Sequence, residues 1–380
     1  NWQENVWKVS KRNNDGSLYV YVHHIWVKYW IILLQIRLVY NIRLNTKIKV
    51  ALIYKKSYNY FQPEHFDRTT YNFFMVALKR HPRLEICYYP VDNYFNTEKL
   101  RGKTDIILLP NNWTDGAPDR LENIKEVGIP VISRTGDPHS AEKYNQVEFM
   151  EKNKIDLLFS SHPDSYIYKF YPKHTKHRTI IYGLEKQLYE KVIPFKERIK
   201  DKILCTGATG KTNIKSKIAN AILNPKRSGW YFYKLRTLTT KLPYVQYSSI
   251  KDGKYPNDDY STYLTRYRAS IAATTFYPTL KYWENAAAGC LTFMEITEKN
   301  NGKFIGFKDN ESCIFINEDN YEKKFQEFLS DPNNPKWEEI AQSGRDFAMN
   351  ELSNDNAAEK IVEIMDKLMW IIRFLPRRFS

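Results

Sequence analysis

The stretch YPTLKYWENAAAGCLTFME, residues 277–295, combines side chains that could hold an anion with a pattern typical of a short helix leading into a buried strand. Pro278 suits the first turn of a helix, where no N–H is needed, and Gly289 suits the left-handed residue that ends one. The start of a helix presents free N–H groups and the positive end of its dipole, to which Thr279 adds a hydroxyl and Lys281 a charge. The sequence therefore predicts an anion site at Thr279, Leu280 and Lys281.

Glu284 lies further along the same predicted helix. At ~1.5 Å per residue it is about 7.5 Å along the axis from Thr279. That separation suits a ligand with a diphosphate at the helix start and a ribose whose two hydroxyls reach the carboxylate. A solvated surface helix in which Lys281 pairs with Glu284 is the alternative.

A second polar loop, CTGATGKTNIKSK at 205–217, follows a predicted strand. It is not a Walker A loop, because Gly207 and Gly210 are too close together for that spacing. Lys211 or Lys217 could neutralise phosphate as a point charge, and a solvated loop lysine is the equal alternative. Gly207 and Lys211 are therefore candidate anion-binding residues.

The loop RTGDPHSAEKY at 134–144 follows the strand PVIS directly. Asp137 and His139 could accept or orient a hydroxyl there and are the candidate catalytic residues. A turn capped by Asp137 before Pro138 is the alternative. The aromatic segment at 57–73 could stack on a sugar ring or simply pack against the first domain.

From residue 46 onward, short apolar runs alternate with amphipathic stretches. Runs such as VALIY, DIILLP, TIIYG, KILCTG and CLTFME predict strands, and stretches such as DRTTYNFFMVALKRH and APDRLENIKEVG predict helices. This α/β pattern predicts two doubly wound domains, at 46–195 and 200–360, with the carboxyl ends of both sheets facing a cleft.

The net charge of +15 over 380 residues makes an anionic partner plausible: a nucleotide, a lipid surface or nucleic acid. The four cysteines are widely spaced, which predicts buried free thiols in a reducing compartment, and the histidines form no metal-binding pattern. The basic, aromatic extension at 1–45 has no charge-free run of roughly 18 residues for a membrane span. It either lies in a membrane interface or packs on the first domain, and the helix and basic tail at 361–380 could join it at an anionic membrane.

KYWENAAAGCLTFME resembles the signature of the GT-B glycosyltransferases, in which a lysine and a glutamate precede a small-residue helix, a glycine and a strand. Within them it is most similar to the CgeB-like, spore-maturation type group, which is related to the large retaining families. FQEFLSDPNNPKWEEIAQSGRDFAMN and the residues after it resemble the end of the same domain. The resemblance spans roughly residues 47–368.

The resemblance implies a GT-B fold, two Rossmann-like domains facing a central cleft, and transfer of a sugar with retention and without a metal or other cofactor. The donor would be a nucleotide sugar held by the C-terminal domain, with Glu284 at the ribose and Lys281, Thr279 and Leu280 at the diphosphate. The acceptor, a glycan or lipid-linked molecule, would lie at the N-terminal domain beside His139. Retaining relatives often carry a second glutamate eight positions before Glu284, where this chain has Phe276.

Three other functions compete with this expectation. The chain could bind a nucleotide sugar without transferring it, as Phe276 suggests, or it could be a nucleotide-sugar epimerase. A nucleic-acid-binding protein is suggested only by the charge, and the basic residues are dispersed, with no nucleic-acid motif. The preferred expectation is a cytoplasmic hexosyltransferase of surface polysaccharide synthesis, with peripheral membrane attachment as an open alternative.

Overall fold

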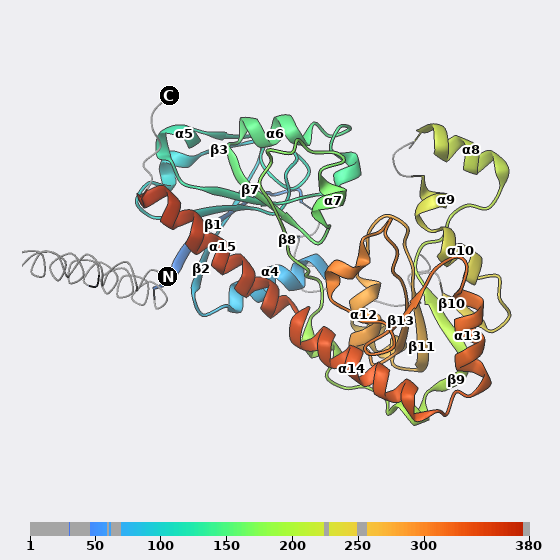
Figure 1. Ribbon diagram of the computed structural model, residues 1–380. Helices are drawn as coiled ribbons and strands as arrows, with labels where there is room; N and C mark the ends of the chain where they lie inside the picture. Colours follow the sequence, from blue (N-terminus) through green and yellow to red (C-terminus); the bar gives the residue numbers. More distant parts are fainter. Residues whose placement is uncertain are drawn as a thin grey trace, which may run out of the picture. The chain divides into compact units, whose positions relative to one another are not determined.

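The computed structural model describes residues 30, 46–58, 61, 70–223, 228–248 and 257–374. The predicted extension at 1–45 and the basic tail after Phe374 therefore lie almost wholly outside the described residues. Residues 49–380 form one compact unit that contains two separate sheets (Figure 1).

The first sheet has the strand order β2-β1-β4-β6-β7-β8. Its strands are β1 (Ile48–Lys55), β2 (Leu84–Val91), β4 (Ile106–Leu109), β6 (Val131–Arg134), β7 (Ile155–Ser160) and β8 (His177–Thr179). The pairs from β1 to β8 are parallel, and every residue of β4 and β6 is buried, as expected of strands covered on both faces. The helices around it are α4 (Thr70–Arg80), α5 (Ile124–Val127), α6 (Gln146–Lys152) and α7 (Asp164–Ile167).

The second sheet is parallel throughout, in the order β10-β9-β11-β12-β13. Its strands are β9 (Ile199–Thr206), β10 (Val245–Ser248), β11 (Tyr267–Ala272), β12 (Leu291–Glu295) and β13 (Ile314–Ile316). Phe293 packs into a cluster with Phe325 and Trp337, and its neighbour Met294 packs into a different cluster with Trp283. Because successive strand residues point to opposite faces, this sheet has a core on each side.

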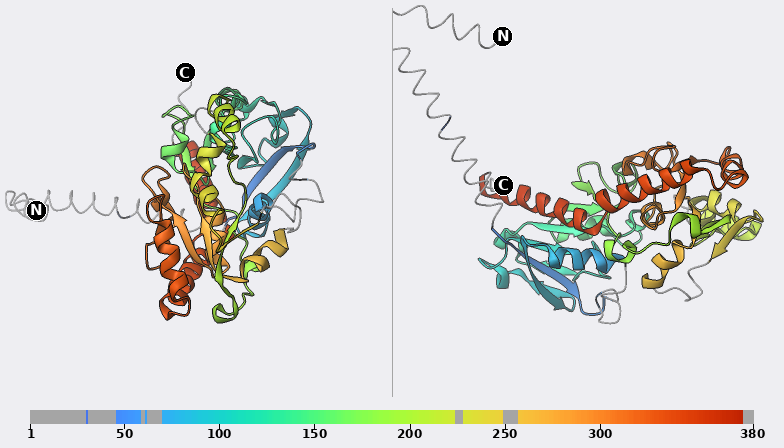
Figure 2. Two further views of the ribbon diagram at one scale, coloured as in Figure 1. Left: turned by 90° about the vertical axis from the view of Figure 1, so that its right-hand side faces the viewer. Right: turned by 90° about the horizontal axis from the view of Figure 1, so that it is seen from below.

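Eight helices among the described residues follow or cover the second sheet. They are α8 (Ile214–Leu223), α9 (Gly229–Phe232), α10 (Lys234–Thr239), α11 (Asn257–Leu264), α12 (Lys281–Ala287), α13 (Tyr321–Ser330), α14 (Pro335–Glu351) and α15 (Asn354–Phe374). α14 packs on α12, whereas α15 returns to the first sheet and packs on α4 (Figure 2). No helix of the described residues is long and apolar enough to cross a membrane.

Two predicted elements were wrong. APDRLENIKEVG contains a short strand, β5 (Arg120–Glu122), which pairs with β3 (Tyr94–Asn96), and only then the single turn of α5. TIIYG is strand only at Thr179, because the following backbone turns away from the sheet and Gly183 N–H donates to Asn354 Oδ1 at 2.6 Å. In both places a tertiary partner for the backbone overrides the local pattern.

The cysteine prediction holds for three residues and fails for one. Cys205, Cys290 and Cys313 are free and buried, but Cys87 is exposed. Cys87 lies on β2, an edge strand of the first sheet on which only the first residue, Leu84, is buried. An apolar run in a sequence does not show whether its strand is central or at an edge.

Candidate functional site

A cleft of about 620 Å³ is lined by residues from both sheets. One wall follows strands β4, β6 and β7, and includes Asn111, Thr135 and His162. The other wall follows strands β9 and β11, and includes Gly207, Thr279 and Glu284. These segments all follow the carboxyl ends of parallel strands, which is the usual place for a ligand in such sheets.

Gly207 brings two cations close to the loop that follows β9. Its φ is +98°, and a Cβ at this position would lie 2.6 Å from Lys281 Cε and 3.2 Å from Arg236 Nη1. Only glycine adopts this backbone conformation without strain and leaves room for both side chains. The positive φ of Gly207 thus allows Lys281 and Arg236 to meet at one point of the cleft.

Arg236 lies on α10 and is only 3% exposed. Its Nη1 donates to the carbonyl of Ala208 at 3.2 Å, but Nε and Nη2 are buried with no hydrogen-bond partner among the described residues. A buried guanidinium with two unused donors is costly unless an acceptor reaches it. The orientation toward the cleft makes an anionic ligand the natural partner.

Lys281 begins α12 and is held by a short chain of hydrogen bonds. Its Nζ donates to the Tyr260 hydroxyl at 2.7 Å, and that hydroxyl pairs with Thr206 Oγ1 at 2.8 Å. Burial lowers the pKa of the Lys281 ammonium, and the nearby Glu284 carboxylate partly opposes this. Burial also raises the pKa of Tyr260 well above 10, so this phenol stays neutral at pH 7.

Glu284 lies one turn after Lys281 and is 8% exposed, while Lys281 is 9% exposed. Burial raises the pKa of the Glu284 carboxyl, and Lys281 opposes this shift. Among the described residues the Glu284 carboxylate has no hydrogen bond or ion pair, so the alternative of a solvated helix with a Lys281–Glu284 pair is wrong. Its carboxylate oxygens are available to a ligand in the cleft.

His162 belongs to the opposite wall and follows β7. Its ring lies 4.4 Å from the Tyr277 ring and stacks on Tyr166 at 5.7 Å, and its Nδ1 lies 3.3 Å from Ser160 Oγ. Burial lowers its pKa to about 3, so the imidazole is neutral at pH 7. The contact with Tyr277 joins the two walls of the cleft.

Two further polar atoms in the first wall lack partners among the described residues. Trp113 Nε1 and Thr135 Oγ1 are buried without a hydrogen bond, and both residues line the cleft. Asp115 and Asp137 line the same wall. This side of the cleft therefore offers an aromatic face, two donors and two carboxylates.

Residues 231–363 match a family described as glycosyl transferase-like, and no curated protein matches the sequence. Sucrose-phosphate synthase from Thermosynechococcus elongatus is similar in structure, with a TM-score of 0.52 and 12% identity over 85% of this chain and 100% of that chain. HepE from Anabaena, in complex with UDP-glucose, has a TM-score of 0.50 and 10% identity over 84% and 100% of the two chains. A glycosyltransferase from Rickettsia africae has a TM-score of 0.50 and 12% identity over 85% and 99%.

The fold is GT-B. The predicted pair of parallel α/β sheets facing a cleft is confirmed. The family match covers the part of the GT-B chain from α9 to α15, which includes Arg236, Lys281 and Glu284.

The GT-B cleft brings together six of the eight residues singled out in the sequence. They are Asp137, Gly207, Thr279, Leu280, Lys281 and Glu284. His139 does not line the cleft: it lines a separate cavity behind the same loop, and its Nε2 lies 3.8 Å from Asp137 Oδ2. Lys211 is exposed and does not line the cleft either, because the chain turns outward toward α8 after Gly210.

Sequence reasoning missed Arg236, Tyr260 and His162. Like His139, His162 comes shortly after an apolar strand in the sequence. His139 follows β6, whereas His162 follows β7, the next strand along the chain. Arg236 and Tyr260 lie on helices with no motif, and only the fold brings them to Gly207 and Lys281. Phe276 does not line the cleft and packs against Tyr231 and Phe232.

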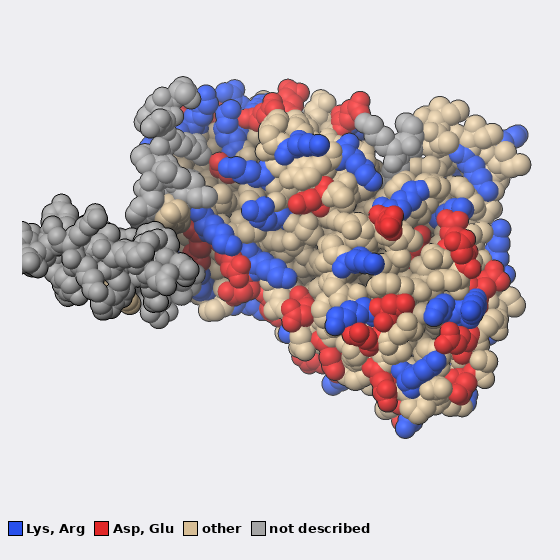
Figure 3. Space-filling view, in the orientation of Figure 1, with Lys and Arg blue, Asp and Glu red and all other residues tan. Residues whose placement is uncertain are grey.

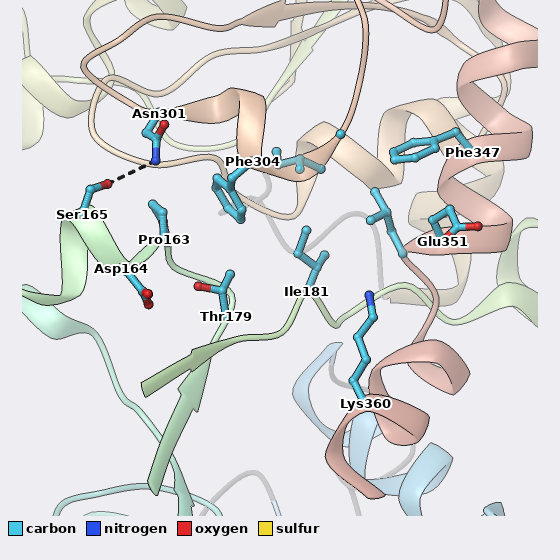
Figure 4. A pocket seen from close by; sticks show the side chains of 13 residues that line it. Pro163, Asp164, Ser165, Thr179, Ile181, Asn301, Phe304, Phe347, Glu351 and Lys360 are labelled. Carbon is cyan, nitrogen blue, oxygen red and sulfur yellow. Dashed lines mark hydrogen bonds between the residues drawn. The ribbon is translucent and has the colours of Figure 1, made fainter. Parts of the chain in front are cut away.

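A second cavity, of about 650 Å³, shares no lining residue with the cleft (Figure 4). Phe304, Ile181 and Leu352 are among its apolar residues, and Asp164, Glu351 and Lys360 are among its polar residues. It contains none of the residues singled out in the sequence. Among the described residues, no group of three His, Cys, Asp or Glu side chains could hold a metal ion.

Proposed function

We propose that this protein is a glycosyltransferase that moves a sugar from a nucleotide-sugar donor to a hydroxyl group of an acceptor. One observation carries the proposal: buried Arg236, with two unused N–H donors, lies with Lys281 at a glycine loop in the cleft. A diphosphate supplies the anionic oxygens that both cations need. The similarity to HepE, solved with UDP-glucose, makes UDP-sugars the first donors to test.

In the proposed complex the donor lies along the second wall. Its diphosphate would lie between Gly207, Arg236 and the two residues before α12, Thr279 and Leu280, with Lys281 beside it. Its ribose would then reach Glu284, one turn further along α12, where a carboxylate accepts hydrogen bonds from two neighbouring hydroxyls.

The transfer breaks the bond between the sugar's anomeric carbon and the diphosphate oxygen, and forms a bond between that carbon and the acceptor oxygen. The acceptor proton passes to the departing diphosphate, so the reaction is balanced without a protein base. Arg236 and Lys281 stabilise the negative charge that grows on the leaving group, and this charge stabilisation would supply much of the catalysis. Neutral His162 would orient the sugar by a hydrogen bond.

The acceptor would lie at the first wall. The Trp113 ring offers a face for a sugar, while Asp115 and Asp137 can accept hydrogen bonds from hydroxyl groups. The unused donors at Trp113 Nε1 and Thr135 Oγ1 fit an oxygen-rich ligand. We therefore propose a glycan or lipid-linked glycan as the acceptor.

The finer attributes of the proposal rest on the resemblance of the segment around α12 to the retaining, CgeB-like enzymes. They are a retained configuration, a hexose as the transferred sugar, no metal requirement and a role in surface polysaccharide synthesis. A product analysis of the configuration tests the first of these directly.

The first test is donor binding by the purified full chain. Thermal shift and titration calorimetry with UDP-, GDP-, ADP- and CMP-sugars should show one preferred nucleotide. Arg236→Met should weaken its binding on the order of 10–100-fold, because a charge-assisted hydrogen bond contributes about 1.5–3 kcal/mol. Arg236→Lys should bind with intermediate affinity, and Lys211→Met, an exposed loop variant, should bind like wild type.

The outcome also separates transfer from binding alone, the alternative that Phe276 raises. Release of nucleotide together with a glycosylated acceptor supports transfer. Tight binding without product in a broad acceptor screen supports a binding protein. If no nucleotide sugar stabilises the wild type, or if Arg236→Met binds as tightly, the donor site is wrong.

A further inference from the structure

Helix α8 carries apolar side chains on its outside. None of its ten residues is buried, and four large apolar side chains are exposed: Ile214 at 74%, Ile218 at 56%, Ile222 at 72% and Leu223 at 76%. Single exposed apolar residues are common on the surfaces of soluble proteins, but a row of them on one short helix is unusual. In Figure 1, α8 lies beyond the end of the second sheet to which the carboxyl end of β9 points.

The isoleucines form one stripe with a lysine on each side. At about 100° per residue, Ile214, Ile218 and Ile222 fall within an arc of about 80°. Lys215 and Lys217 fall on opposite flanks of that arc. The polar face is turned toward α9. Asn220 Oδ1 lies 3.8 Å from the point that a Cβ would occupy on Gly229, and Lys217 Nζ lies 3.7 Å from the centre of the Trp230 ring.

The chain segment that contains this stripe carries charge of one sign. Residues 202–251 contain ten Lys or Arg and no Asp or Glu. Figure 3 shows basic but no acidic side chains over α8 itself, at the upper right, with acidic side chains starting just below it. Acidic residues are common elsewhere on the face shown, so the bias belongs to this part of the chain.

We propose that α8 docks the protein on an anionic lipid membrane, with Ile214, Ile218 and Ile222 among the lipid headgroups and the exposed Lys211 and Lys215 at the phosphates. An apolar stripe flanked by lysines is the pattern of helices that lie in a membrane interface. The absence of acidic residues from 202–251 matches a negative surface, at which each nearby lysine adds to binding. Exposed isoleucines would contribute nothing to binding the phosphates of a nucleic acid, whereas they insert among lipids.

This docking would hold the cleft near the lipid surface. α8 begins at Ile214, directly after the loop that starts at the cleft residue Gly207. Only a few residues therefore separate the donor wall from the proposed membrane contact. A lipid-linked acceptor could then enter the cleft from the bilayer. That consequence rests on the proposed function, whereas the docking itself rests on α8 alone.

The test is sedimentation of the full chain with vesicles of phosphatidylcholine alone or with phosphatidylglycerol added. Wild type should bind the anionic vesicles and not the neutral ones. Ile214→Asn combined with Ile218→Asn should weaken binding at least about tenfold, and so should Lys211→Glu combined with Lys215→Glu, which change two exposed lysines. All four side chains project from the surface, so circular dichroism and the melting temperature should not change.

Two control variants match these changes away from α8. Ile199→Asn alters an isoleucine that is 40% exposed, and Lys125→Glu with Lys152→Glu reverses two exposed lysines. Both should bind anionic vesicles like wild type. A general effect of net charge would weaken the lysine control equally, and that result would overturn the proposal.

Three other results would also overturn it: no vesicle binding by wild type, equal binding by the α8 isoleucine variant, or self-association that the variant abolishes without any vesicle binding. Donor titrations on the same variants keep the two proposals apart. If vesicle binding depends on α8 while no nucleotide sugar binds, the membrane site stands and the glycosyltransferase proposal falls.

Discussion

Gly207, Arg236 and Lys281 show how single residues set the character of the cleft. Each alone is ordinary: a loop glycine, a helix arginine and a lysine at a helix start. Together they form a buried positive site in which two guanidinium donors have no partner among the described residues. Buried hydrogen-bond donors without a protein partner are expected where a bound ligand supplies the acceptors.

Gly207→Ala is expected to weaken donor binding at least about tenfold and to destabilise the fold by about 1–3 kcal/mol, because the new methyl would overlap Lys281 Cε and the backbone would be strained. Calorimetric titration of the donor and urea unfolding measure the two effects. Gly102→Ala is the matched control: its φ is +70°, with nothing within 4 Å, so it should lose stability but keep donor affinity. Equal donor affinity in the Gly207 variant would show that Lys281 does not touch the donor.

His162 makes stability depend on pH. Its pKa falls from the ordinary 6.5 to about 3 in the folded chain because it is buried, so only the unfolded chain takes up the proton between these values. Stability from this residue is therefore complete above pH 6.5 and is lost as the pH falls toward 3. At pH 5 the loss is about 2 kcal/mol relative to pH 7.

Urea unfolding at pH 7 and pH 5 tests this expectation. His162→Gln should reduce the difference between the two pH values by about 2 kcal/mol. His174→Gln, at an exposed histidine, should leave the difference unchanged. An equal pH dependence in wild type and the His162 variant would mean that His162 takes up its proton in the folded chain as well.

At the scale of elements, α12 positions the donor wall because α14 and strands β11 and β12 pack against it. All its residues are buried, and Tyr282 fixes it by donating from its hydroxyl to the Glu295 carbonyl at 2.9 Å. α14 packs against it, and Arg345 of α14 donates to the carbonyl of Ala287 at the end of α12. A helix held in this way keeps Lys281 and Glu284 in place without a ligand.

Gly344 of α14 is the point of closest approach in this packing. A Cβ there would lie 2.2 Å from the Ser312 carbonyl oxygen and 3.9 Å from Ala286 Cβ. Gly344→Ala is expected to destabilise the protein by about 1–3 kcal/mol, because a backbone atom must shift. Ser343→Ala, at an exposed neighbour on α14, should not destabilise it. Urea unfolding of both variants measures the difference, and unchanged stability in the Gly344 variant would show that the contact relaxes freely.

At the scale of the compact unit, α15 ties the two sheets together. It follows α14, which belongs to the second sheet, and packs on α4 of the first. Arg83 Nη1 and Nη2 donate to the two oxygens of Asp366 at 2.6 and 3.0 Å, and Arg80 contacts both Asp355 and Glu185. The last helix therefore limits how the walls of the cleft move relative to each other.

A double-mutant cycle of Arg83→Ala and Asp366→Ala tests this link. The pair is bidentate but partly exposed, so we expect a coupling of about 1 kcal/mol in urea unfolding. The same cycle on Lys308 and Glu311, an exposed pair within one loop, should give about 0–0.5 kcal/mol. A coupling of zero for Arg83 and Asp366 would mean that packing of α15 on α4, rather than the ion pair, holds the sheets together.

The α/β class, most strands and the candidate donor residues followed from local patterns. Apolar runs and the segment from Pro278 to Gly289 reflect backbone preferences that act over a few residues. Gly289, for example, adopts the expected left-handed conformation, with a φ of +73°. The predictions failed where residues distant in the chain interact. The side-chain oxygens of Asn153 and Asn354 accept hydrogen bonds from the backbone N–H groups of Leu121 and Gly183. The loop after β6 places His139 in a separate cavity rather than in the cleft. The approach of Arg236, Tyr260 and His162 to the site, and the exposed stripe of α8, likewise depend on how whole elements pack. Long-range contacts leave no periodic trace in a single chain, so only the tertiary structure could reveal them.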